Sequence, residues 1–178
     1  MVTPDTVRRV ILDAARLVKR GEIVVFGSAS LAFWLRDAPR SRDVDLWVVP
    51  EDRGEIVEAV MGELSWYHER HDAYVEVLGP LTFEAPRTWR ERARVVPMPE
   101  APDVVLVVPH PHDVLVAKIA RYTPTDQEHV RLILAEHPMD RARLGALASE
   151  SPNRSSADPA VVAGFDTNLA RVLALLPG

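Results

Sequence analysis

The stretch Ile23–Val49 constrains the fold of this chain more than any other part of the sequence. It opens with a short apolar run, which is typical of a buried strand, and Gly27-Ser28 then interrupts that run. A compact apolar segment of helical length follows, and a polar loop leads into a second strand-like run over residues 43–49. The order of strand, turn, short helix and strand therefore predicts a fold that mixes helices with a sheet.

Two carboxylates lie two positions apart on the second of these strands. In Asp43-Val44-Asp45-Leu46, the strand period of two puts Asp43 and Asp45 on one face and the apolar residues on the other. A solvated strand face would carry the same residues. However, magnesium takes oxygen ligands and completes its shell with water and substrate phosphates. The pair therefore predicts a site for a divalent metal.

Gly27-Ser28 predicts an anion site next to these carboxylates. Glycine lets the backbone approach a ligand closely. A helix that opens near Ser28 would aim free N–H groups and the positive end of its dipole at an anion. Alone, a Gly-Ser turn is common between elements. Together with a carboxylate pair, it indicates a nucleotide phosphate that binds with metal.

The ordered combination of Gly27-Ser28 with Asp43-Val44-Asp45 resembles the signature of the nucleotidyltransferase superfamily related to DNA polymerase beta. Within it, the chain is most similar to the small prokaryotic AbiEii-type toxins and minimal nucleotidyltransferase antitoxins. The resemblance implies an α+β fold, in which helices flank a mixed sheet, and a helical C-terminal part. It also implies a metal-dependent enzyme that uses two magnesium ions and a nucleoside triphosphate.

The superfamily completes its metal site with a third carboxylate from a later strand. The apolar run Ala73–Leu78 predicts such a strand, and Glu76 within it is the first candidate. Asp72, just before the strand, is the alternative. The resemblance therefore implies that Asp43, Asp45 and Glu76 are the catalytic metal ligands.

The segment from Pro111 to Leu134 is also similar to the superfamily, in which a Lys on one helix and an Asp after a short turn lie beside the nucleotide. Lys118 and Asp126 match these positions, and Arg121 is a weaker third match. An ammonium near the triphosphate would offset charge on the leaving pyrophosphate. A second acidic residue usually follows that Asp by three positions, but His129 stands there in this chain.

Composition limits the remaining possibilities. The chain has 178 residues, which suits a core at residues 1–109 with a helical C-terminal region at 110–178, or one single domain. It has no cysteine, so disulfides, thiol catalysis and thiolate zinc sites are excluded. A net charge of −5 argues against a surface that binds nucleic acid everywhere. With no leader and no run of about 20 apolar residues, we expect a cytoplasmic protein without membrane contact.

Further patterns predict individual elements. Thr3-Pro4 and Asp158-Pro159 are typical of helix starts, and the run Val104–Val108 is typical of a strand buried on both faces. Four other predictions cover a short strand at 66–68, a helix that carries Arg87, Arg90 and Arg94, a capping box at 125–128, and a flexible linker at 150–157.

Two functional classes stay open on the sequence. In the first, the chain transfers a nucleoside monophosphate to an unknown hydroxyl acceptor, which can be the end of a tRNA or other RNA, a protein or a small molecule. In the second, the chain is a catalytically idle binding protein of the same fold, such as an antitoxin or other interaction partner. The apolar face of the last helix packs either on the same chain or on a second copy in a homodimer.

Overall fold

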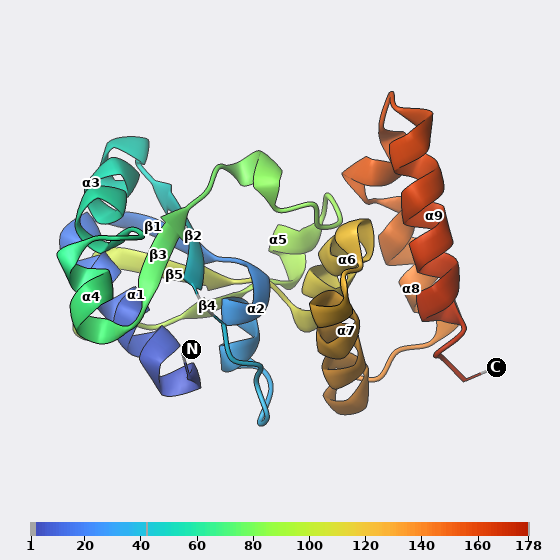
Figure 1. The fold of residues 1–178 in the computed structure, drawn as a ribbon, viewed down its shortest axis with the longest axis horizontal. Helices are drawn as coiled ribbons and strands as arrows, with labels where there is room; N and C mark the ends of the chain where they lie inside the picture. The colour runs from blue at the N-terminus through green and yellow to red at the C-terminus, as the bar shows by residue number, and fades with distance from the viewer. Residues whose placement is uncertain (1–2, 42, 178) are drawn as a thin grey trace. The chain divides into compact units, whose positions relative to one another are not determined.

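The computed structural model describes residues 3–41 and 43–177 of the chain. The chain divides into two compact units (Figure 1). Unit 1 holds the chain up to Thr82 together with Ala93–Pro109, and unit 2 holds Phe83–Arg92 and the chain from His110 onward. The short segment Phe83–Arg92 therefore belongs with the C-terminal helices although it lies between two strands of unit 1.

Unit 1 is built around a five-stranded sheet in the order β3-β2-β1-β5-β4. β1 runs antiparallel to β2 and parallel to β5, β2 runs parallel to β3, and β4 runs antiparallel to β5. The sheet is therefore mixed, which confirms the predicted α+β class. Its strands are β1 (Gly21–Val25), β2 (Asp43–Val49), β3 (Tyr74–Val77), β4 (Arg94–Val96) and β5 (Val104–Val108).

The first helix of unit 1 begins where the sequence supplies a cap. The hydroxyl of Thr3 accepts a hydrogen bond from the N–H of Thr6, and Pro4 fills the first helical position of α1, as predicted. The helical segments are α1 (Pro4–Val18), α2 (Gly27–Ser30), the 3-10 turn η1 (Leu31–Phe33), α3 (Glu51–Met61), α4 (Trp66–His71) and the 3-10 turn η2 (Pro80–Thr82).

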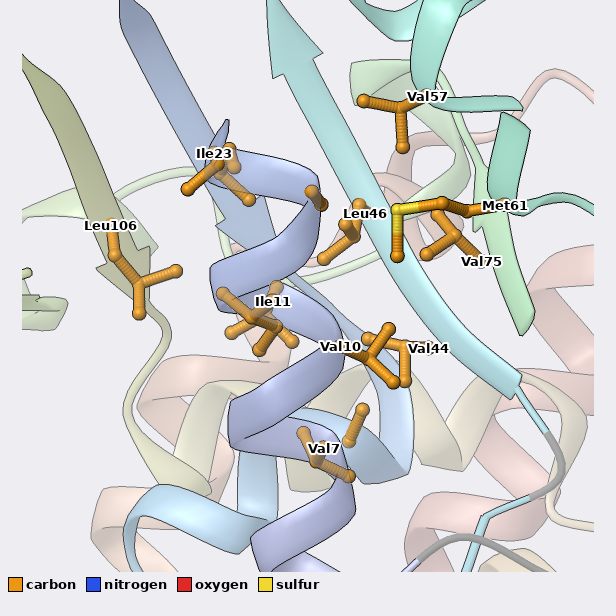
Figure 2. Close-up of a cluster of buried hydrophobic side chains, with 14 of the residues drawn as sticks. Val7, Val10, Ile11, Ile23, Val44, Leu46, Val57, Met61, Val75 and Leu106 are labelled. Carbon is orange, nitrogen blue, oxygen red and sulfur yellow. The ribbon is translucent and has the colours of Figure 1, made fainter. Parts of the chain in front are cut away.

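The core of unit 1 lies between α1, α3 and one face of the sheet. Figure 2 shows Ile11 of α1 beside Leu106 of β5, and Met61 of α3 beside Leu46 of β2. Because side chains alternate along a strand, Val44 and Leu46 point into this core while their neighbours in β2 point to the other face. The core therefore fixes which way the two aspartates of β2 face.

The outer edge of β3 is closed by a side chain from α3. The N–H of Leu78 donates to the carbonyl of Leu46 in β2, so the preceding N–H, that of Val77, points away from β2. Glu58 accepts a hydrogen bond from this N–H, with an N···O distance of 2.7 Å. The carboxylate takes the place that another strand would occupy at this position.

Two sequence predictions in this part of the chain are wrong. Residues 66–68, predicted as a strand, begin helix α4, because the hydroxyl of Ser65 caps its first turn by accepting from the N–H of His68. The predicted helix that carries three arginines is interrupted after one turn. α5 (Trp89–Arg92) belongs to unit 2, whereas Arg94 begins strand β4 of unit 1.

Unit 2 consists of helices. Three of its large buried side chains, Leu115, Leu144 and Phe165, come from α6, α8 and α9, which contact one another. The helices are α5, α6 (Pro111–Arg121), α7 (Pro124–Glu136), α8 (Arg141–Ser149), the 3-10 turn η3 (Pro152–Ser155) and α9 (Pro159–Leu173). None of the helices in residues 3–41 and 43–177 is long and apolar enough to span a bilayer.

A buried ion pair joins α5 to α6 within unit 2. Arg92 donates from both Nε and a terminal nitrogen to the carboxylate of Asp113, with a shortest N···O distance of 2.6 Å. The side chain of Asp113 is fully buried. The hydrogen bonds to Asp113 raise the pKa of the Arg92 guanidinium, so this partner stays charged. Thr88 also accepts from Arg92 and donates to Glu150.

Two further sequence predictions in unit 2 are wrong. The capping box of α7 is formed by Thr123 and Asp126, not by Thr125 and Glu128, because Pro124 occupies the first helical position. The predicted flexible linker contains the ordered turn η3, in which Ser151 caps the turn and is buried. Asp158 caps α9 as the sequence predicts.

Candidate functional site

Three carboxylates meet on the face of the sheet opposite α1. β2 presents Asp43 and Asp45 on this face, and the parallel register places Glu76 of β3 directly beside Asp45. One oxygen from each side chain lies within 4.8 Å of the others. Among residues 3–41 and 43–177, this is the only group of three or more acidic, His or Cys side chains arranged to hold a metal ion. Such a set of oxygen ligands suits a hard divalent cation.

Asp72 does not join this group. It is the C-cap residue of α4 and has a left-handed backbone, with φ of 48°. The parallel pairing of β2 with β3 places Glu76, and not Asp72, beside Asp45. The structure thus brings Glu76 to the two aspartates and leaves Asp72 at the end of the preceding helix.

Gly27 lies against the carboxylate of Asp45. Its backbone has φ of +55°, and a Cβ atom built on it would lie 2.3 Å from Oδ2 of Asp45. The N–H of Phe26 donates to the carbonyl of Asp45, which holds the two segments at this distance. Only glycine allows both the left-handed backbone and the close approach. Gly27 therefore lets the carboxylate of Asp45 lie directly against the backbone at this turn.

A line of three side chains connects the Gly-Ser turn to the carboxylates. The hydroxyl oxygens of Ser28 and Ser41 lie 2.9 Å apart, and Ser41 donates to Oδ1 of Asp43 at 3.1 Å. Ser41 is buried, so its hydroxyl is held in place by its surroundings as well as by these bonds. Sequence analysis missed Ser41, and its only signal was a hydroxyl residue two positions before Asp43.

Lys118, Arg121 and Asp126, which were predicted from the helical segment, lie together in unit 2. Nζ of Lys118 lies 3.0 Å from Oδ1 of Asp126, and Arg121 approaches the same oxygen at 3.6 Å. Burial alone would raise the pKa of Asp126, but Lys118, Thr123 and Arg121 together lower it. Asp126 therefore stays ionised, and the ammonium of Lys118 is buried beside it.

His129 lies in the next turn of α7, after Asp126. Its side chain is buried, and its Nδ1 atom has no hydrogen-bond partner. Burial, together with the positive charge of Lys118, lowers the pKa of His129 to about 4, although the negative charge of Asp126 opposes this. The imidazole is therefore neutral at pH 7, at a position where the resemblance implies an acidic residue.

A mixed sheet with a Gly-Ser turn and clustered carboxylates on adjacent strands is the arrangement expected of the nucleotidyltransferase class. Comparison with protein families then identifies the particular family. Residues 5–158 match the family described as "Nucleotidyltransferase of unknown function (DUF6036)". The match covers most of the chain, so the chain belongs to this family. No curated protein matches the chain.

Proposed function

We propose that this protein is a metal-dependent nucleotidyltransferase that moves a nucleoside monophosphate from a nucleoside triphosphate to a hydroxyl acceptor. The observation that carries the proposal is the convergence of Asp43, Asp45 and Glu76 beside the Gly27-Ser28 turn. Family membership supports the reaction class. The carboxylates lie close enough together to hold divalent cations, as the expected magnesium cofactor requires.

Each residue of the site has a defined part in this proposal. The three carboxylates would hold the metal, and the absence of a side chain at Gly27 lets the carboxylate of Asp45 lie against the backbone there. Ser28 would contact the triphosphate, while Ser41 fixes both Ser28 and Asp43. Bound magnesium would stabilise negative charge on the transferred phosphoryl group and on the leaving pyrophosphate. Positioning and charge stabilisation account for most of the rate enhancement in such reactions.

The contacts predicted for Lys118, Arg121 and Asp126 stay part of the proposal. Within unit 2, both cations face the carboxylate of Asp126. A triphosphate that reaches Lys118 would therefore compete with Asp126 for the ammonium. This ion pair, together with a neutral His129, favours the second candidate function, an idle nucleotidyltransferase fold that acts by binding a partner.

Labelled nucleotides separate the two functions. The full chain is incubated with magnesium, a cell lysate and each of the four nucleoside triphosphates, labelled on either the α- or the γ-phosphate. A nucleotidyltransferase moves the α-label to an acceptor and releases the γ-label in pyrophosphate. Compared with the lysate alone, an idle protein adds no transfer of either label, and added transfer of the γ-label alone would contradict the proposal.

Matched variants then assign the activity to the site. We expect Asp43→Asn with Asp45→Asn, and separately Glu76→Gln, to abolish transfer of the α-label. Asp72→Asn is the control, because it removes the alternative carboxylate and asparagine tolerates the left-handed backbone there. Loss of transfer in Asp72→Asn but not in Glu76→Gln would overturn the assignment of the third ligand.

The proposal extends to the class of acceptor and to the biological role of the transfer. Similarity to AbiEii-type toxins and minimal nucleotidyltransferase antitoxins predicts a role in a toxin-antitoxin pair. Fractionation of the labelled lysate into RNA, protein and small molecules identifies the acceptor class. Label in the RNA fraction that is concentrated at tRNA ends would favour a toxin, whereas label in one protein would favour an antitoxin that modifies its partner.

A further inference from the structure

We propose that unit 1 carries a second ligand site, which binds an amphipathic anion with a carboxylate head and an apolar body. A cavity of about 360 Å³ lies between α1, η1, β4, β5 and the segment after β4. Its size falls in the range of roughly 300–1,000 Å³ that is usual for small-molecule sites. Nothing in the proposed transfer reaction uses it.

The cavity lies on the opposite face of the sheet from the three carboxylates. Leu106 of β5 lines it and pairs with Ile23 of β1, which in turn pairs with Val48 of β2. These residues share the face that packs on α1, whereas Asp43 and Asp45 point the other way. The second site is therefore separate from the proposed metal site.

Two arginines line the cavity, and consecutive backbone carbonyls orient them. Arg8 donates to the carbonyl of Ala32, and Arg94 donates to the carbonyl of Phe33, both at 3.0 Å. Arg8 lies 5.8 Å from the centroid of the Phe33 ring, and Arg94 lies 4.8 Å from that of Trp34. Each guanidinium has five N–H donors, so the remaining donors can bind a planar carboxylate.

The charge of the lining favours a single negative charge on the ligand. Besides Arg8 and Arg94, the lining contains one charged residue, Glu100. In the part of the chain that the structure describes, Arg94 forms no ion pair. Arg8 approaches Asp5 at 3.6 Å, but both side chains are exposed, so this pair contributes little. The site therefore has an excess of one positive charge.

The rest of the lining is apolar. Leu12, Val96 and Met98 are half-buried and form the walls, while Ile11 and Leu106 are buried in the core beneath them. These side chains can cover an aliphatic chain, and the aromatic ring of Phe33 adjoins the charged end. An apolar cavity with cations on one side fits a molecule such as a medium-chain fatty acid.

Calorimetric titration of the full chain with decanoate, below its micelle-forming concentration, tests the site. We expect saturable one-to-one binding, and 1-decanol should bind at least about tenfold more weakly because it lacks the charge-assisted hydrogen bonds. Equal binding of decanoate and 1-decanol would overturn the anion site. Absence of saturable decanoate binding would overturn the whole proposal.

Paired variants locate the binding. Arg94→Gln should weaken decanoate binding about tenfold. Arg90→Gln should leave it unchanged, because Arg90 stacks on Trp89 at the same 4.8 Å but does not line the cavity. Met98→Trp should fill the cavity and prevent binding with both arginines retained. Equal loss in Arg94→Gln and Arg90→Gln would contradict the location.

The second site is also separable from the proposed enzyme activity. The variant with Asp43→Asn and Asp45→Asn should bind decanoate as the natural chain does, since those residues lie on the other face. Failure of nucleotide transfer would therefore leave this result intact. Loss of decanoate binding in that variant, with an unchanged melting temperature, would contradict two separate sites.

Discussion

At the scale of single residues, Gly27 lies so close to the carboxylate of Asp45 that no side chain fits between them. We predict that Gly27→Ala lowers the free energy of unfolding by at least about 1 kcal/mol, because it strains a left-handed backbone and pushes Asp45 aside. Urea unfolding measures the change. Gly145→Ala is the control, since a Cβ there meets nothing within 4 Å, and in the middle of α8 it should stabilise by about 0.5–1 kcal/mol. Nucleotide transfer should be lost only in Gly27→Ala.

Ser41 should act as a positioning residue. Without its hydroxyl, Asp43 loses a hydrogen bond and Ser28 loses its neighbour. We expect Ser41→Ala to raise the magnesium concentration needed for half-maximal transfer about tenfold, as loss of a contact that orients a ligand usually does. Ser41→Thr keeps the hydroxyl and should restore the natural value. An unchanged magnesium requirement in Ser41→Ala would contradict the role.

His129 makes the stability of the chain depend on pH. Its pKa is about 4 in the folded chain and near 6.5 in the unfolded chain, so the unfolded chain takes up the proton first as the pH falls. The contribution of the neutral imidazole to the free energy of unfolding is fully present above pH 6.5. It is lost between pH 6.5 and 4, by about 3 kcal/mol in total. His129→Gln should flatten this part of the pH profile. Equal slopes in both proteins would contradict the prediction.

The residues of the carboxylate site were predictable to different degrees. Asp43 and Asp45 follow from strand alternation and Gly27 from its turn, because these are local properties. Glu76 needed the resemblance, and its position beside Asp45 depends on the register between two strands. Ser41 could not be predicted, since its partners depend on how a loop folds back onto the Gly-Ser turn.

At the scale of elements, the buried pair of Arg92 and Asp113 connects α5 to α6. We predict that Arg92→Met alone lowers the free energy of unfolding by about 3 kcal/mol or more, because it leaves a buried carboxylate without its partner. Adding Asp113→Leu should recover much of the loss. Arg154→Met is the control, since its pair with Asp166 has a similar length, 2.7 Å, but is exposed and should contribute less than about 1 kcal/mol.

Helices with strong N-terminal caps were predictable from the sequence. Elements too short to show a regular spacing of apolar residues were not. Pro4 and Pro159 mark the starts of α1 and α9 in the sequence, and both helices begin there. Residues 66–68 were predicted as a short strand from three aromatic residues, but the cap at Ser65 begins a helix there. Strand β4 was missed because three residues are too few to show the alternation of a strand. Only its pairing with β5 defines it.

At the scale of the whole molecule, the question is whether α9 holds one chain or two together. Phe165, Leu169 and Val172 of α9 are buried, and the helix contacts α6 and α8. We predict that Phe165→Ala lowers the free energy of unfolding by about 3–5 kcal/mol. Neither this decrease in the free energy of unfolding nor the melting temperature should depend on protein concentration, because the contacts of α9 lie within one chain. A melting temperature that rises with concentration would favour a homodimer.

The carboxylate of Glu58 at the edge of β3 has a consequence for solubility. An open sheet edge is a template for fibril growth, and proteins protect such edges with charged side chains. Glu58 occupies the N–H of Val77, so an incoming strand would have to break this bond and bury a negative charge. The side chain that completes the fold of unit 1 at this edge thus also works against the polymerisation of one molecule onto the next.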